Sequence, residues 1–187
     1  MEAWFQLQTL IWLFPIVFIF HDFEEIIMAE RWFTANTANL RRTLPKRWAD
    51  RVLQQFSMST AQFAVAVLVV FLFVSSSTYM ANQYLQGGPL GNLQFFVVCT
   101  LVLFLHIFTH LGQAIYFRSI TPGSITSLIL LLPYSLALYH KLLEQGIITW
   151  STILQCLPYV LLAVPVVLLA HKTGKTLIRT EARSSVL

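Results

Sequence analysis

The chain has 187 residues, of which 57% are hydrophobic and only 11% are charged. A soluble globule needs more polar surface than this composition supplies, so the sequence predicts an integral membrane protein. The net charge of +4 indicates membrane orientation and attraction to anionic headgroups, and no nucleic-acid-binding motif accompanies it. The apolar runs lack period-two alternation and therefore predict helices rather than a β-barrel.

Five apolar segments each come close to the roughly 20 residues that a helix needs to cross a bilayer. The predicted fold is an all-α membrane bundle with five transmembrane helices in a single domain. Prolines inside the later segments predict kinks, because neighbouring helices can satisfy the backbone groups that a proline frees. The five segments cover residues 7–29, 59–80, 92–117, 123–140 and 147–170.

The basic residues predict the orientation of this bundle. All but Lys141 of the 12 lysines and arginines fall on one side of the predicted membrane, and they include Arg179 and Arg183 in the tail. Cytoplasmic loops carry the excess of basic residues, so the N-terminus is predicted outside and the C-terminus in the cytoplasm.

Residues 31–58 are predicted to form a cytoplasmic amphipathic loop, the one sizeable soluble segment. Within it Trp48, Val52 and Phe56 have i, i+4, i+8 spacing, and Pro45 suits the start of a helix. This pattern favours a helix lying on the cytoplasmic membrane surface. A solvated connector is the alternative.

The segment "HDFEE" at residues 21–25 places a histidine and three acids inside the first predicted span. The span must continue through them, because residues 7–20 rise only about 21 Å as a helix and the hydrocarbon core is about 30 Å thick. An acid at the centre of a membrane helix costs on the order of 2.5–3.5 kcal/mol. These residues therefore need polar partners inside the bundle, unless the first helix simply ends among the headgroups.

The segment "LHIFTHLGQ" at residues 105–113 supplies candidate partners. His106 and His110 have i, i+4 spacing, as do His21 and Glu25, and Glu24 flanks the same face. The two polar faces lie at similar distances from the basic residues that end their spans, so they share one depth in the bilayer. Imidazoles and carboxylates at one point form a metal-ligand set. Interhelical hydrogen bonding between the histidines is the alternative.

Further polar residues at this depth are predicted to support the ligands. Gln62, Gln113 and Tyr116 are candidates to hydrogen-bond a ligand side chain. Asp22 points about 100° away from His21 around the helix, and is predicted to orient a ligand or to lie at the interface.

Three features in order resemble a known family: "HDFEE" (21–25), "HIFTH" (106–110) and "YFRSITPGSITSLILLLP" (116–133). They are similar to the HXXEE-domain family of bacterial integral membrane proteins, over His21 to Pro133. The resemblance implies a multi-pass protein of the bacterial cytoplasmic (inner) membrane. It also implies a metal-binding or catalytic role for His21, Glu24 and Glu25, without giving a substrate.

Three classes of function use these residues. The favoured prediction is a hydrolase in which zinc is held by His21, His106, His110 and one of Glu24 and Glu25, while the other glutamate is the general base. A di-iron oxidase or hydroxylase would use the same five groups. A proton- or cation-coupled transporter, or a non-enzymatic subunit, would also carry intramembrane His and Glu. The predicted substrate is a lipid-like or amphipathic molecule, and the sequence leaves open whether a homodimer completes the site.

Overall fold

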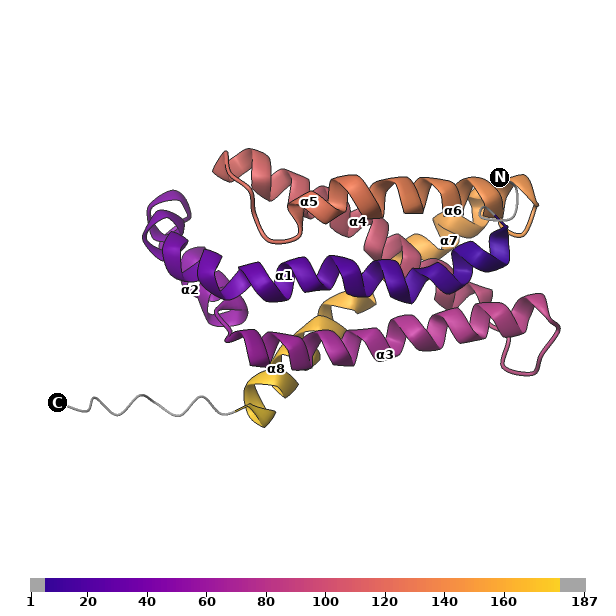
Figure 1. Ribbon diagram of the computed structural model, residues 1–187, viewed down its shortest axis with the longest axis horizontal. Helices are drawn as coiled ribbons and strands as arrows, with labels where there is room; N and C mark the ends of the chain where they lie inside the picture. Colours follow the sequence, from indigo (N-terminus) through magenta and orange to yellow (C-terminus); the bar gives the residue numbers. More distant parts are fainter. Residues whose placement is uncertain (1–5, 179–187) are drawn as a thin grey trace.

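The computed structural model describes residues 6–178, and every regular element among them is helical. Arg179 and Arg183, which contributed to the orientation prediction, lie outside the described residues. Figure 1 shows the long helices running roughly along one axis, with α8 crossing α3. The elements are α1 (Leu7–Thr43), α2 (Lys46–Phe56), α3 (Thr60–Leu85), α4 (Leu93–Phe117), α5 (Ser124–Thr126), a π-helical turn (Ser127–Leu131), α6 (Leu132–Glu144), α7 (Trp150–Cys156), a 3₁₀ turn (Leu157–Leu162) and α8 (Ala163–Leu177).

Within residues 6–178, four helical segments are long and apolar enough to cross a membrane. They are Thr60–Leu85, Leu93–Phe117, Ser124–Glu144 and Trp150–Leu177, and they coincide with the second to fifth predicted spans. The length and composition of these segments identify a membrane protein, and its described secondary structure is entirely helical. The first span, and with it the count of five and the orientation, stays a prediction.

Helix α1 extends well beyond the predicted end of the first span at residue 29. It continues to Thr43, so the segment predicted as a loop from residue 31 is largely helical. The polar residues there follow the end of the predicted apolar span, but they do not end the helix. The hydroxyls of Thr34 and Thr37 donate to backbone carbonyls one turn earlier in the helix. The helix ends at Thr43, and Leu44 is extended, because Pro45 disfavours helical geometry in the residue before it. Helix α2 begins directly after Pro45, where the amphipathic pattern lies.

Helix α1 packs between α3 and α6 (Figure 1). Phe14 meets Phe96 of α4 edge to face, with 5.5 Å between ring centroids. The hydroxyl of Tyr134 in α6 donates to the carbonyl of Leu10 at 2.9 Å. Buried positions recur every three or four residues along the helix, and the HDFEE segment continues that stripe. They are Leu7, Leu10, Ile11, Phe14, Val17, Phe18, His21 and Asp22.

Irregular turns occur where the sequence predicted proline kinks. The π-helical turn Ser127–Leu131 ends two residues before Pro133, and the 3₁₀ turn Leu157–Leu162 contains Pro158. A proline lacks the N–H that the regular ladder needs, so the neighbouring hydrogen bonds shift register. The first of these turns follows the residues that pack against the candidate site.

Candidate metal centre

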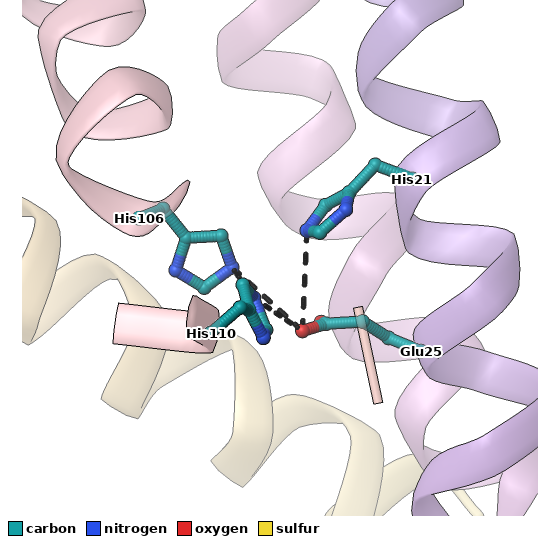
Figure 2. Close-up of side chains that lie close together, drawn as sticks. All are labelled: His21, Glu25, His106 and His110. Atoms are coloured by element: carbon teal, nitrogen blue, oxygen red, sulfur yellow. Dashed lines mark hydrogen bonds and ion pairs between the residues drawn. The ribbon is translucent and has the colours of Figure 1, made fainter. Parts of the chain in front are cut away.

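Four side chains from two helices converge on one point (Figure 2). His21 and Glu25 come from α1, and His106 and His110 come from α4. Glu25 Oε1 lies 2.9 Å from His110 Nε2, 3.7 Å from His106 Nε2 and 4.0 Å from His21 Nε2. The Nε2 atoms of His106 and His110 are 2.7 Å apart. One ligand atom from each residue lies within 4.8 Å of all the others, so the group could hold a metal ion.

The geometry fits a small divalent cation. Around a tetrahedral zinc with bonds of about 2.0–2.1 Å, adjacent ligand atoms are about 3.3 Å apart, and the separations here fall on both sides of that value. His21 Nε2 is buried, points into the group and has no hydrogen-bond partner. A buried nitrogen with an unshared electron pair is unfavourable unless something binds it. A bound metal ion would therefore satisfy His21 Nε2, which the other three side chains leave without a partner.

Glu24 is not part of the group, although it was predicted as a ligand or base. Its Oε2 accepts hydrogen bonds from the N–H and the hydroxyl of Thr126, at 2.7 and 2.6 Å, and its Oε1 accepts from the N–H of Ile125 at 3.2 Å. These donors are at the start of α5, where N–H groups lack helical partners and a carboxylate is favoured. The structure thus does not bring Glu24 together with the other four predicted residues but has its side chain anchor the start of α5. A ligand or base role for Glu24 stays a prediction.

Thr126 connects Glu24 to His21. Its single hydroxyl proton is donated to Glu24, so the hydroxyl oxygen must accept at 2.8 Å from His21 Nδ1. Nδ1 of His21 is then the protonated nitrogen, and Nε2 presents its lone pair to the group. Metal-binding histidines are commonly oriented in this way through the second ring nitrogen. Nothing in the sequence singled out Thr126, because its role depends on where α5 lies.

Gly123 makes this close approach sterically feasible. Its φ of +77° is favourable only for glycine, and a Cβ there would lie 2.7 Å from Cε1 of His110 and 2.9 Å from Cε1 of His21. The turn at Gly123 therefore packs directly on two of the imidazoles.

The segment that carries these residues matches a family model. Residues 12–138 match a family described as proteins of unknown function with an HXXEE motif. The chain belongs to the HXXEE family. The match includes both helices that supply the group and the turn that packs on it, and it confirms the resemblance drawn from the sequence. Of the residues in the HXXEE motif, His21 and Glu25 belong to the group, and Glu24 faces α5. No curated protein and no solved structure matches the chain.

The other predicted supporting residues lie in different places. The amide of Gln62 accepts from the N–H of Ser59 and donates to the carbonyl of Ile178, and so caps α3. Gln113 and Tyr116 line a cavity beside the group, and the Tyr116 hydroxyl donates to a carbonyl at the end of α1. A supporting role of Gln62 for a ligand stays a prediction.

A cavity of about 1070 Å³ adjoins the HXXEE residues between α1, α3, α4 and the segment from α7 to α8. Asp22, Glu25, His106 and His110 line it together with several amides and His171, and aliphatic and aromatic side chains form most of the remaining wall. Ligand pockets for small molecules are typically about 300–1,000 Å³. The group is thus accessible from a mainly apolar space large enough for a sizeable ligand.

Proposed function

We propose that this protein is a membrane-embedded, metal-dependent enzyme, and specifically a zinc hydrolase acting on a lipid-like or amphipathic molecule near the cytoplasmic leaflet. In this proposal α1 is the first of five spans of a bacterial cytoplasmic membrane protein whose N-terminus is outside. The observation that carries the proposal is the convergence of four potential ligand atoms within 4.8 Å beside a large apolar cavity.

The structure suggests how the residues would divide the work. His21, His106 and His110 would hold the ion, since three protein ligands leave a position open in catalytic zinc sites. When bound, zinc supplies Lewis acidity and lowers the pKa of water from its bulk value to about 7. Glu25 would take the proton from that water, because Glu24 has both oxygens engaged at the start of α5. The Thr126 hydroxyl would keep the His21 ring in the required orientation.

The donor set favours zinc over two irons. Helix-bundle di-iron sites use several glutamates with two histidines, whereas this group contains one carboxylate and three imidazoles. A di-iron oxidase would have to recruit Asp22, which lines the same cavity. Transport is the second candidate, because the cavity extends past the group toward both Gln94 and Leu44. A carrier needs access from two sides, and an enzyme needs it from one.

Elemental analysis of the purified protein tests the metal directly. We expect near-stoichiometric zinc in the wild type and its loss in His21→Ala, His106→Ala and His110→Ala. His140→Ala is the matched control, since this exposed histidine of α6 lies outside the group. Folded wild type that takes up no metal, even after reconstitution, would overturn the proposal. Iron in place of zinc would shift it to the oxidase.

A further inference from the structure

The short helix α2 forms part of the cavity wall at one end of the bundle. Its side chains Val52 and Phe56 line the cavity beside Leu44, which follows the end of α1. Ala49 lies on the same face of α2 and is only 1% exposed. The basic side chains of α2 are exposed on its other faces: Lys46, Arg47 and Arg51. The apolar face of this amphipathic helix is therefore turned toward the cavity and the bundle.

Helix α8 holds the C-terminal end of α2 through two polar side chains. Nζ of Lys175 donates to the backbone carbonyls of Gln54 and Gln55, at 2.5 and 3.1 Å. These carbonyls are among the last four of α2, which have no partner within the helix, and a cation is favoured at this end of the helix dipole. One turn earlier on α8, Nδ1 of His171 hydrogen-bonds the side-chain amide of Gln55 at 3.0 Å.

Beyond these contacts, α2 buries little surface. Of its 11 residues only Ala49 is buried, and Phe56 stays 42% exposed although its ring stacks on Phe33 of α1 with 6.2 Å between centroids. Residues without helical structure flank α2 on both sides, at 44–45 and at 57–59. Elements with few buried apolar contacts open at a low cost in free energy, and the lids of binding sites are drawn from such elements.

The cavity connects α2 with the metal-binding group. Along α1 its lining continues from Glu25 through Ala29 and Phe33 to Leu40, about 22 Å at 1.5 Å per residue. We propose that α2 is a lid on this end of the cavity, that Lys175 latches the lid to α8, and that release of the latch admits a ligand to the group. That the admitted molecule is the substrate rests on the function proposed above.

The reactivity of a cysteine inside the cavity tests the lid. Ala29→Cys, in a protein carrying Cys99→Ala and Cys156→Ala, places a single thiol between α2 and the group. Its reaction with a water-soluble methanethiosulfonate is followed by mass spectrometry on zinc-free protein in nanodiscs. We expect this thiol to react at least about tenfold more slowly than one at the exposed position Asp50→Cys. Lys175→Met, which removes the cation and keeps the length of the side chain, should quicken the reaction of Ala29→Cys about tenfold, as expected for the loss of a hydrogen bond from a charged group.

Two controls separate release of the lid from other effects. Lys172→Met removes an exposed lysine from the same helix and should leave the rate unchanged. Amide hydrogen exchange in Lys175→Met should quicken in α2 and stay unchanged in α4, which excludes a general loosening of the bundle.

Three results would each overturn the inference. They are reaction of Ala29→Cys as fast as that of Asp50→Cys, an unchanged rate in Lys175→Met, and an equal increase in Lys172→Met. A gated cavity in a protein that takes up no zinc would overturn the proposed function and leave the lid standing.

Discussion

Replacing Gly123 by alanine tests whether the turn before α5 shapes the metal centre. A left-handed residue other than glycine costs about 1–2 kcal/mol. The added Cβ would also lie 2.7 Å from His110 and 2.9 Å from His21, well inside ordinary contact distance, and overpacking of this kind typically costs a further 1–3 kcal/mol. We therefore expect a loss of about 2–5 kcal/mol in the free energy of unfolding, with both rings pushed out of position.

Two other glycines separate the contributions. Gly146 has φ of +64° and a Cβ there would meet nothing within 4 Å, so Gly146→Ala carries the backbone cost alone. Gly112 lies inside α4 with open space around its Cβ, so Gly112→Ala should be neutral or stabilising by up to about 1 kcal/mol. Only Gly123→Ala should combine destabilisation with weaker metal binding, by at least about tenfold, because ligands displaced by more than about 0.5 Å no longer match the ion.

Denaturant unfolding in detergent and competitive zinc titration measure the two effects on the three variants. The reasoning would be refuted if Gly123→Ala bound zinc as tightly as the wild type and lost no more stability than Gly146→Ala. That result would mean that the turn moves to accommodate the imidazole rings and does not determine their positions.

Three further substitutions probe the contacts of α1. Thr126→Val removes the hydroxyl that orients His21 and should weaken zinc binding about 10–100-fold in a competition titration, while Thr126→Ser should restore it; equal affinity in all three proteins would contradict the relay. Glu24→Gln should keep full zinc content by elemental analysis yet lower the thermal midpoint, because it weakens the anchor of α5; loss of metal would return Glu24 to the ligand set. The hydroxyl and the N–H of Thr60 lower the pKa of Glu30. These hydrogen bonds therefore stabilise the folded protein above the ordinary glutamate pKa, and this stabilisation is lost as the pH falls through the pKa of Glu30 in the folded state. Glu30→Gln should flatten this acid limb of the curve of unfolding free energy against pH.

The sequence was sufficient to pair the two helices that carry the group. The i, i+4 spacings of His21 with Glu25 and of His106 with His110 place each pair on one helix face, and the depth of both pairs could be counted from flanking basic residues. The four side chains that meet in the structure were all among the five predicted. Helical periodicity determines the face on which each polar pair lies, and the membrane span determines its depth, so few arrangements of the two pairs are possible.

The choice between the two glutamates could not be made from the sequence. Glu24 and Glu25 differ by one position on α1, and their roles depend on where Thr126 and the start of α5 pack, which is a tertiary matter. The length of α1 was also missed, because hydrophobicity reports where a span ends and not where a helix ends. Only Pro45 carried a local signal for the true terminus.

The division of the candidate metal centre between α1 and α4 has a consequence for biosynthesis. Roughly 80 residues separate Glu25 from His106, and at about 5–20 residues per second the ribosome needs on the order of 4–16 s to make them. If α1 enters the bilayer as proposed, its acidic residues lack the histidines of α4 during this interval, because α4 has not yet been synthesised. Early insertion intermediates must therefore hold α1 in a hydrated or chaperoned setting, and completion of α4 and the Gly123 turn becomes the step that commits the first helix to the membrane.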